Sequence, residues 1–427
     1  MDGFLTTPQM ACGNHSNVVW ALVTHAPFFA RATSRSSIVI SLPMTRPKRS
    51  SLNQSKSLFT TLVLLLVLAL MPAACRRAQK PTLVVTELRI PTSDSDYRGL
   101  EAVMVRPDDH APHPLALITH GTWGGPAERS QVTPLAFVPQ AREFARRGWT
   151  AVIVLRRGFG DSGGIYMEEA EECSLSPNPA WSTQQAAKDL REAASYLATR
   201  AEVDGSRMIG IGLSTGGLAM LGLSADPPPG LKAVINFAGG RGSDGKDHVC
   251  NPDALIRTFG DLGKRSRIPT LWVYAANDHF FGPQLAQQLY QAFLENGGNV
   301  RFVATGPFGA DGHGLFSLQG APIWTPLVDE FLLSQNLMLR DTLLADPLPD
   351  VEAPAHLGRE ARKQFEAYLL NAPHKAFAIS RSGAFGFSYG QRTTAAAEGK
   401  ALANCNKFTS GDIPCTIAAI DDAKSPN

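Results

Sequence analysis

The sequence predicts an α/β protein with a doubly wound, mostly parallel sheet, followed by a small α+β module. Three observations predict this architecture. Short apolar runs alternate with segments of helical periodicity over residues 82–337. A stretch rich in proline and acidic residues, 346–355, is typical of a linker. A shorter, cysteine-bearing segment follows at 356–427 and suggests a β-β-α-β pattern.

Composition and charge limit the classes of function. Hydrophobic residues make up 44% of the 427 residues, which is normal for a folded protein and too high for a disordered one. The 40 Lys and Arg residues nearly balance the 38 Asp and Glu residues, so the formal net charge is +2. A charge this small gives no electrostatic reason to expect a nucleic-acid partner.

The N-terminal part contains the features of an export signal at 44–75. Leu58–Met71 is uncharged and short for a membrane span. Basic residues precede it and the small residues Ala73 and Ala74 follow it, which is the arrangement of a secretory signal. Because such a signal starts near its basic segment, we expect translation to begin at Met44 and residues 1–43 to be a non-native upstream extension.

The residues around Cys75 resemble the lipidation box of bacterial lipoproteins, in which the cysteine carries the lipid and becomes the mature N-terminus. Met71 and Pro72 depart from this pattern, because leucine is preferred there. Ordinary cleavage and an uncleaved anchor therefore stay open as alternatives. The expected location is the periplasm, with a lipid anchor to the membrane.

The elements of the predicted sheet follow one another in a regular order. Two opening strands are expected at 82–90 and 100–106, and later buried strands at 115–119, 150–155, 208–212, 233–237, 270–275 and 300–304. The expected helices between and after them lie at 139–147, 182–200, 215–223, 253–259, 284–296 and 324–334. Right-handed crossovers then bring the loops after the parallel strands to one edge, where ligands bind.

The pattern Gly-x-Ser-x-Gly occurs twice, and its context separates the two serines. Ser214 lies between an apolar strand and a helix-forming segment, which is the context of a nucleophile elbow. Ser162 is separated from its strand by four residues and no helical pattern follows it. We therefore interpret Ser214 as a nucleophile and Ser162 as a loop residue.

A serine nucleophile needs a base and an orienting acid, which follow it in the order acid, then histidine. Asp278 comes directly after a buried strand, and His313 lies between two glycines after the last strand. They are the predicted acid and base. Asp311 is an alternative acid, but it lies in the same loop as His313. His279 is expected to be a neighbour of the acid.

An oxyanion hole needs backbone N–H donors near the nucleophile. One comes from the residue after it, Thr215, and the second from the loop after an earlier strand, where HGTWGG occurs. Thr122 is the predicted second donor, with Trp123 as the alternative. His120 is expected to have a structural role.

The segments HGTWGG, RGFGDSGG, GLSTGG, AANDHF and GHG occur in the order found in α/β-hydrolases. Residues 82–337 thus resemble that superfamily, and most closely its dienelactone hydrolase and prolyl-oligopeptidase-like members. Dienelactone hydrolases themselves use a cysteine nucleophile, whereas this chain has Ser214. The resemblance therefore implies a serine hydrolase that cleaves carboxylic esters, and the signal features at 44–75 predict that it is exported. Such a triad needs no metal or organic cofactor.

Four cysteines remain when Cys12 and Cys75 are set aside, an even number that suits an oxidising compartment. The resemblance places Cys173 and Cys250 on loops that flank the elbow strand, which implies a disulfide at the pocket rim. Cys405 and Cys415 would then close the small module. Four free buried thiols are the alternative. Trp123, Tyr166 and Phe280 are candidate substrate-binding residues, with plain packing as their alternative role.

Two other functions stay open. One is a serine peptidase that cuts small peptides. The other is a catalytically idle envelope protein whose C-terminal module binds an unknown partner. An intact Ser, Asp and His set argues against idleness, and no metal ligand pattern is present in the sequence.

Overall fold

The computed structural model describes residues 83–122, 125–168, 173, 178–245, 247–354, 357–409 and 413–425. The chain divides into two compact units, Met1–Arg77 and Ala78–Asn427, and all described residues belong to the second. The predicted signal at 44–75, its Cys75 and the segment 1–43 lie outside the described residues, as does Trp123. Within the described part, no helix is long and apolar enough to cross a membrane.

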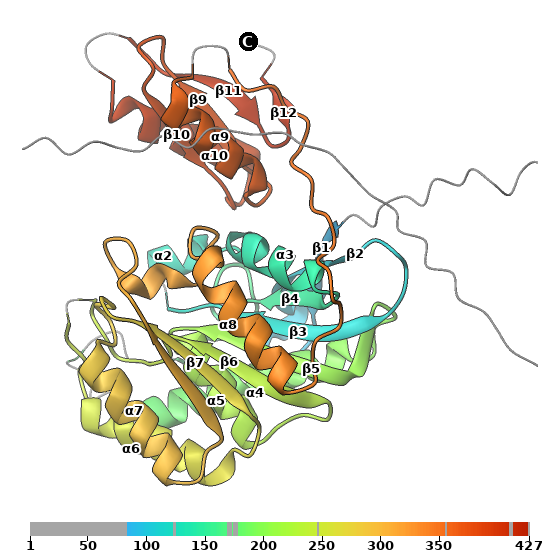
Figure 1. Cartoon of the computed structure of the whole chain (residues 1–427), viewed down its shortest axis with the longest axis vertical. Coiled ribbons are helices and arrows are strands. Elements are labelled where there is room, and N and C mark those ends of the chain that lie inside the picture. The colour runs from blue at the N-terminus through green and yellow to red at the C-terminus, as the bar shows by residue number, and fades with distance from the viewer. Residues whose placement is uncertain are drawn as a thin grey trace, which may run out of the picture. The chain divides into compact units, whose positions relative to one another are not determined.

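The central sheet has eight strands in the order β1-β2-β4-β3-β5-β6-β7-β8 (Figure 1). Strand β2 pairs antiparallel with both neighbours, and every other pair is parallel. The predicted doubly wound, mostly parallel sheet is thus confirmed. Its strands are β1 Leu83–Ile90, β2 Leu100–Pro107, β3 His113–Thr119, β4 Thr150–Val154, β5 Val203–Leu213, β6 Leu231–Phe237, β7 Thr270–Ala275 and β8 Val300–Thr305.

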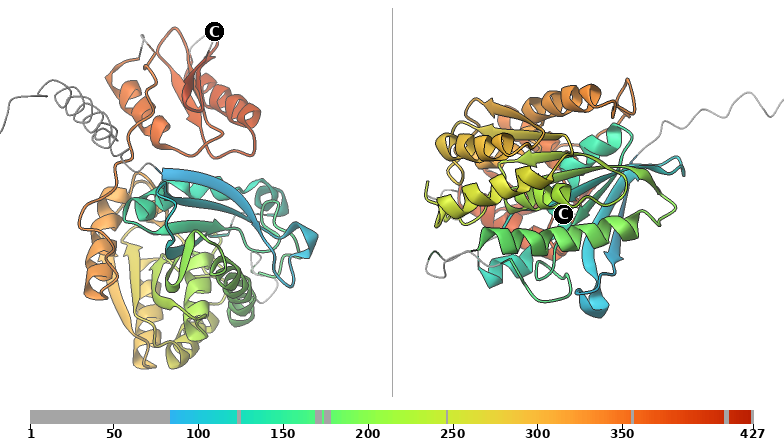
Figure 2. Two further views of the ribbon diagram at one scale, coloured as in Figure 1. Left: turned by 90° about the vertical axis from the view of Figure 1, so that its right-hand side faces the viewer. Right: turned by 90° about the horizontal axis from the view of Figure 1, so that it is seen from below.

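Helices cover both faces of this sheet. One face packs against Phe144 of α3 and Trp324 of α8, and the other against Leu190 of α4 and Phe259 of α6, all of which are buried. In Figure 2 the β1–β2 hairpin, in blue, lies at one edge of the sheet. The main helices are α3 Val138–Arg146, α4 Pro179–Leu197, α5 Thr215–Ala225, α6 Pro252–Arg265, α7 Pro283–Glu295 and α8 Ala321–Ser334, with a short α2 at Pro126–Gln131.

Helix α4 begins earlier than the sequence predicts. The sequence predicts a start at 182, but the cap is Asn178, since its side-chain oxygen accepts a hydrogen bond from the Trp181 N–H at 3.0 Å. Pro179 follows at the first helical position, where a missing N–H costs nothing. Ser182 is buried within the first turns, and its hydroxyl donates to the Asn178 carbonyl.

The C-terminal module is an antiparallel sheet of order β10-β9-β11-β12 between two helices. Phe365 and Tyr368 of α9 pack against Phe377 on one face, and Ala401 of α10 packs on the other. The predicted β-β-α-β order is present, with α9 before it and β12 after it. The elements are α9 Arg359–Leu370, β9 Ala376–Ile379, β10 Phe385–Ser388, α10 Thr394–Asn406, β11 Thr416–Ile420 and β12 Ala423–Lys424.

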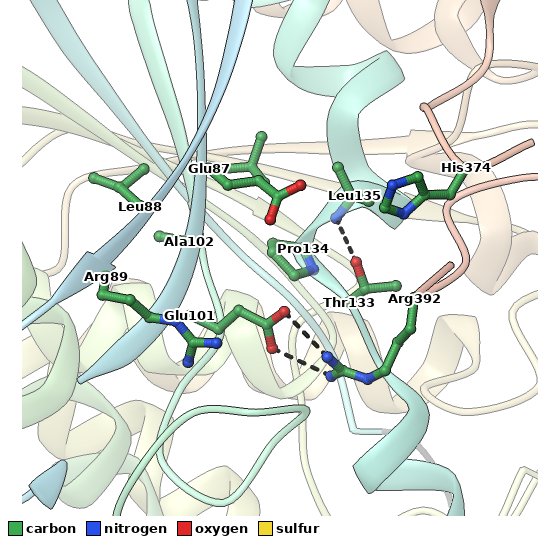
Figure 3. Close-up of a pocket in the computed structure, with 11 residues that line it drawn as sticks. Glu87, Leu88, Arg89, Glu101, Ala102, Thr133, Pro134, Leu135, His374 and Arg392 are labelled. Atoms are coloured by element: carbon green, nitrogen blue, oxygen red, sulfur yellow. Dashed lines mark hydrogen bonds and ion pairs between the residues drawn. The ribbon is translucent and has the colours of Figure 1, made fainter. Parts of the chain in front are cut away.

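One arginine of this module contacts the large sheet. Arg392 forms an ion pair with Glu101 of β2 at 3.2 Å (Figure 3). Its guanidinium also donates to the Val132 carbonyl. The pair lies at a cavity of about 310 Å³ that is also lined by His374 of the module. The module therefore contacts the segment that follows α2.

Candidate active site

Ser214 occupies the sharp turn between β5 and α5. Its φ of 56° and ψ of −123° are a strained conformation for a residue with a side chain. A Cβ on Gly212 would lie 2.2 Å from the Gly216 carbonyl oxygen, and a Cβ on Gly216 would lie 2.3 Å from the His120 carbonyl oxygen. The two glycines therefore permit a turn that no larger residue fits. This is the geometry of a nucleophile elbow.

Asp278 and His313 come together at the same edge of the sheet. The His313 ring nitrogen Nδ1 lies 3.0 Å from Oδ2 of Asp278, whose side chain is fully buried. The N–H groups of Phe280 and Phe281 donate to Oδ1 at 2.8 and 2.9 Å, so the carboxylate is fixed by the backbone. Phe280 also stacks on the imidazole, with 4.2 Å between ring centroids. The acid follows β7 and the histidine follows β8.

The strand order, the antiparallel β2 and the three residues after β5, β7 and β8 decide the fold family. The fold is that of the α/β-hydrolases. Ser214 and His313 line one cavity, and the structure describes no direct hydrogen bond between the two side chains. Such hydrogen bonds are often long before a substrate binds.

A known family model matches part of this chain. The model of the X-Pro dipeptidyl-peptidase (S15) family matches residues 96–258, a segment that contains Ser214 but neither Asp278 nor His313. No curated protein matches the sequence.

Several solved structures are also similar to the hydrolase. A protein described as a dienelactone hydrolase from Klebsiella pneumoniae subsp. pneumoniae is 18% identical, with a TM-score of 0.40, over 58% of this chain and 98% of that one. Thermogutta terrifontis esterase 2 is 18% identical, with a TM-score of 0.42, over 60% and 94% of the two chains. A Pyrococcus furiosus esterase is 14% identical, with a TM-score of 0.43, over 59% and 90%.

The loop after β3 lies directly beside the nucleophile. A Cβ on Gly121 would lie 3.0 Å from the Cβ of Ser214, so this glycine lets the loop approach closely. The Thr122 hydroxyl donates to the Thr215 hydroxyl at 3.1 Å, which joins the two residues predicted to form the oxyanion hole. The Thr215 N–H belongs to the first turn of α5, where backbone donors have no partner within the helix.

The cavity around Ser214 has a volume of about 920 Å³. Phe280, Phe281 and Leu213 give it apolar walls, while Arg241 and Asp244 add charge. Phe280 is thus where the sequence predicts it. Among the described residues, no group of three or more His, Cys, Asp and Glu side chains could hold a metal ion.

Tyr166 is not among the described residues that line this cavity. Its ring packs against the Phe159 ring, with 5.3 Å between the ring centroids. The Arg129 guanidinium carbon lies 3.9 Å from the centroid of the Tyr166 ring. Its hydroxyl donates to the Glu168 carbonyl at 2.8 Å. The structure therefore gives Tyr166 the packing role that was its alternative, because its ring contacts Phe159 and Arg129.

Ser162, the serine of the first Gly-x-Ser-x-Gly match, is a buried loop residue. Its hydroxyl donates to the Leu155 carbonyl at 2.8 Å and accepts from the Glu101 N–H at 2.9 Å. Asp311 accepts from the N–H groups of His313 and His279 rather than from the imidazole. The His279 ring contacts Asp247 instead of the predicted acid.

His120 is fully buried and held as a neutral ring. Its Nδ1 lies 2.6 Å from the Gly121 carbonyl oxygen, so it carries the proton, and Nε2 accepts from the Arg156 N–H at 3.2 Å. Burial, and then the nearby Arg156 charge, lower the pKa of His120 to about 3. The structural role predicted for this histidine fits these contacts.

The buried neutral His120 predicts a loss of stability in acid. The unfolded chain takes up a proton near pH 6.5 and the folded chain does not, so the free energy of unfolding falls as the pH drops below that value. At pH 5, His120 alone lowers the free energy of unfolding by about 2 kcal/mol. We expect His120→Gln to remove this part of the pH dependence in urea unfolding, and His110→Gln to leave it. An identical pH dependence in wild type and His120→Gln would contradict the assignment.

Both predicted disulfides are present. Cys173–Cys250 joins the loop after β4 to the loop after β6, and Cys405–Cys415 closes the end of α10 onto β11. Their sequence separations are 77 and 10 residues. The first therefore ties together two loops that contribute residues to the cavity, Glu168 and Arg241.

The two disulfides are expected to differ in their effect on stability. A crosslink that closes a longer loop restricts the unfolded chain more. Replacing Cys173 and Cys250 by serine should lower the free energy of unfolding by roughly 2–4 kcal/mol. The same change at Cys405 and Cys415 should lower the free energy of unfolding by a smaller amount. Urea unfolding of the two double variants measures both, and a larger loss for the shorter loop would refute the prediction.

Sequence reasoning missed a buried group of charges beside the cavity. Glu168 forms ion pairs with Arg156 and, at 2.7 Å, with Arg241, and all three side chains are at most 3% exposed. The signal in the sequence was the pair Arg156-Arg157 directly after the apolar run 151–155. Charges at that point need buried partners.

Proposed function

We propose that this α/β-hydrolase is an exported serine hydrolase that cleaves carboxylic esters. One observation carries the proposal: Ser214, on its strained turn, lines the same cavity as His313, whose ring is held by the buried Asp278. A serine, a base and an acid that orients the base are the groups that acyl transfer needs.

The proposed reaction has two halves. Ser214 Oγ attacks the ester carbonyl carbon while His313 Nε2 takes the hydroxyl proton. The N–H groups of Thr122 and Thr215 stabilise the tetrahedral oxyanion. The intermediate expels the alcohol, which takes the proton from His313 and leaves an acyl group on Ser214. Water then attacks the acyl carbonyl carbon while His313 Nε2 takes a proton from it. The second tetrahedral intermediate breaks its bond to Ser214 Oγ, which takes the proton back from His313, and the carboxylic acid is released. The Asp278 carboxylate holds the imidazole throughout.

The cavity supports a small or medium-sized ester. Its apolar walls, formed by Phe280, Phe281 and Leu213, suit an acyl or alcohol chain. Because Phe280 stacks on the imidazole, a substrate group that packs against Phe280 also lies next to the base.

A small-peptide substrate is the second candidate. The match to the X-Pro dipeptidyl-peptidase family model favours it. A panel of p-nitrophenyl esters and aminoacyl-nitroanilides separates the two functions. The proposal predicts a kcat/KM at least about 100-fold higher for the best ester than for the best anilide. A reversed ratio would establish the peptidase.

Export and lipidation are part of the proposal. The signal-like segment 44–75 supports export, and two disulfides suit an oxidising compartment. If Cys75 carries the lipid, radiolabelled palmitate should label the wild type, and Cys75→Ala should abolish the label. Labelling that persists in Cys75→Ala would exclude this lipidation site.

A further inference from the structure

The guanidinium of Arg156 connects the segments around Ser214. Arg156 follows β4 and has no exposed surface. Its Nη1 donates to the Thr119 hydroxyl at 2.8 Å and to the His120 carbonyl at 2.7 Å. Its Nη2 donates to the Thr215 hydroxyl at 3.2 Å and to Glu168 at 3.0 Å, and Nε donates to the other Glu168 oxygen. An arginine has five N–H donors, so all of them are used.

These partners belong to both sides of the proposed oxyanion hole. Thr119 ends β3 and His120 begins the loop of Thr122, while Thr215 follows the nucleophile. The Arg156 backbone N–H also donates to the His120 ring. Arg156 thus fixes the spacing between the two backbone donors, the N–H groups of Thr122 and Thr215. Donors must lie about 2.7–3.1 Å from the oxyanion, so a small displacement weakens them.

Glu168 and Arg241 complete this support. Burial favours the neutral form of Glu168, but the charges of Arg156 and Arg241 outweigh it and lower its pKa to about 2. Glu168 is therefore ionised at neutral pH and holds both guanidiniums. Arg241 lies on the loop after β6 and donates to the Glu168 carbonyl as well, at 3.1 Å. The loops after β4 and β6 are thereby linked to the elbow.

We propose that Arg156 is a positioning residue that sets the geometry of the oxyanion hole, acting through Thr215 and the His120–Thr122 loop. This rests on the proposed function, because it presumes that the two backbone N–H groups stabilise an oxyanion. Arg156 does not touch the substrate. Its effect is therefore expected in the transition state and not in substrate binding.

The test compares Arg156→Lys with Arg157→Lys in the full chain. Lysine keeps the charge but cannot make the five-donor fork. Arg157 is the matched control, since it is the next residue, equally enclosed, and pairs with Asp189 and Asp94 away from the elbow. With a p-nitrophenyl ester, Arg156→Lys should lower kcat about 10- to 100-fold and change KM by less than about threefold. Arg157→Lys should change kcat by less than about threefold.

The inhibition constant of a tetrahedral inhibitor is a measurement that a merely structural role of Arg156 would leave unchanged. An alkylboronic acid adds to Ser214 Oγ to form a tetrahedral boronate, with one boron-bound oxygen in the oxyanion hole. Its Ki should rise in Arg156→Lys by the same factor by which kcat/KM falls. A second variant keeps the test decisive if Arg156→Lys folds poorly. Thr215→Val removes the hydroxyl that Arg156 contacts, whereas Thr215→Ser keeps it. We expect the loss of kcat to be about tenfold larger in Thr215→Val than in Thr215→Ser.

The outcomes separate the two claims. If Ser214→Ala keeps its reactivity towards a fluorophosphonate, the proposed function fails. If Ser214→Ala loses it, but Arg156→Lys and Thr215→Val retain wild-type kcat and Ki, the positioning role alone is overturned. Equal losses in Arg156→Lys and Arg157→Lys, or a loss confined to KM, would also overturn it.

Discussion

Ser214→Ala should lower kcat for ester hydrolysis by at least about 10⁴-fold while the protein stays folded. The change removes the only atom that forms the acyl-enzyme. The fold should persist because the Ser214 hydroxyl does not cap α5 and faces the cavity. Hydrolysis of a p-nitrophenyl ester by the purified variant, with its urea midpoint, measures both effects.

Ser162→Ala is the matched control, since Ser162 stands in the other Gly-x-Ser-x-Gly pattern of the same chain, at 160–164. Its hydroxyl bridges Leu155 and Glu101 in the interior, so its loss leaves buried backbone groups without a partner. We expect a stability loss of about 1–3 kcal/mol with kcat within about threefold of wild type. Activity that disappears in Ser162→Ala and survives in Ser214→Ala would reverse the assignment.

Asp278→Asn is expected to have the second-largest effect, a loss of about 10³- to 10⁴-fold in kcat. The carboxylate accepts two backbone N–H groups and the His313 N–H, so an amide placed there would favour the wrong imidazole tautomer. Steady-state kinetics at neutral pH measures the loss.

Asp311→Asn tests the competing acid. Asp311 accepts a hydrogen bond from the backbone N–H of His313 but not from its ring. Asp311→Asn should therefore lower kcat by less than about tenfold. Similar losses in the two variants would show that Asp278 alone does not orient the base.

Much of this site could be predicted from the sequence because it depends on local patterns. The glycines around Ser214 are required by backbone contacts shorter than any side chain allows. Asp278 directly follows a strand of the alternating pattern, and His313 lies in the loop after the last one, so topology alone brings them to one edge. The Cys173–Cys250 disulfide followed from the same placement, and Cys405–Cys415 from the closeness of the two cysteines in sequence.

What the sequence did not reveal depends on contacts between distant segments. Tyr166 lies in the loop after β4, yet Arg129 and Phe159 hold its ring away from the cavity. The Arg156–Glu168–Arg241 group joins three loops, and no periodicity records such a group. The ion pair between Arg392 and Glu101 likewise spans 291 residues of chain.

Mass spectrometry of the protein treated with a fluorophosphonate tests the central claim most directly. The account predicts a single phosphonyl adduct on Ser214, formed with loss of fluoride, and slower labelling when a good ester competes. An adduct on Ser162, or no adduct on a folded protein, would contradict it.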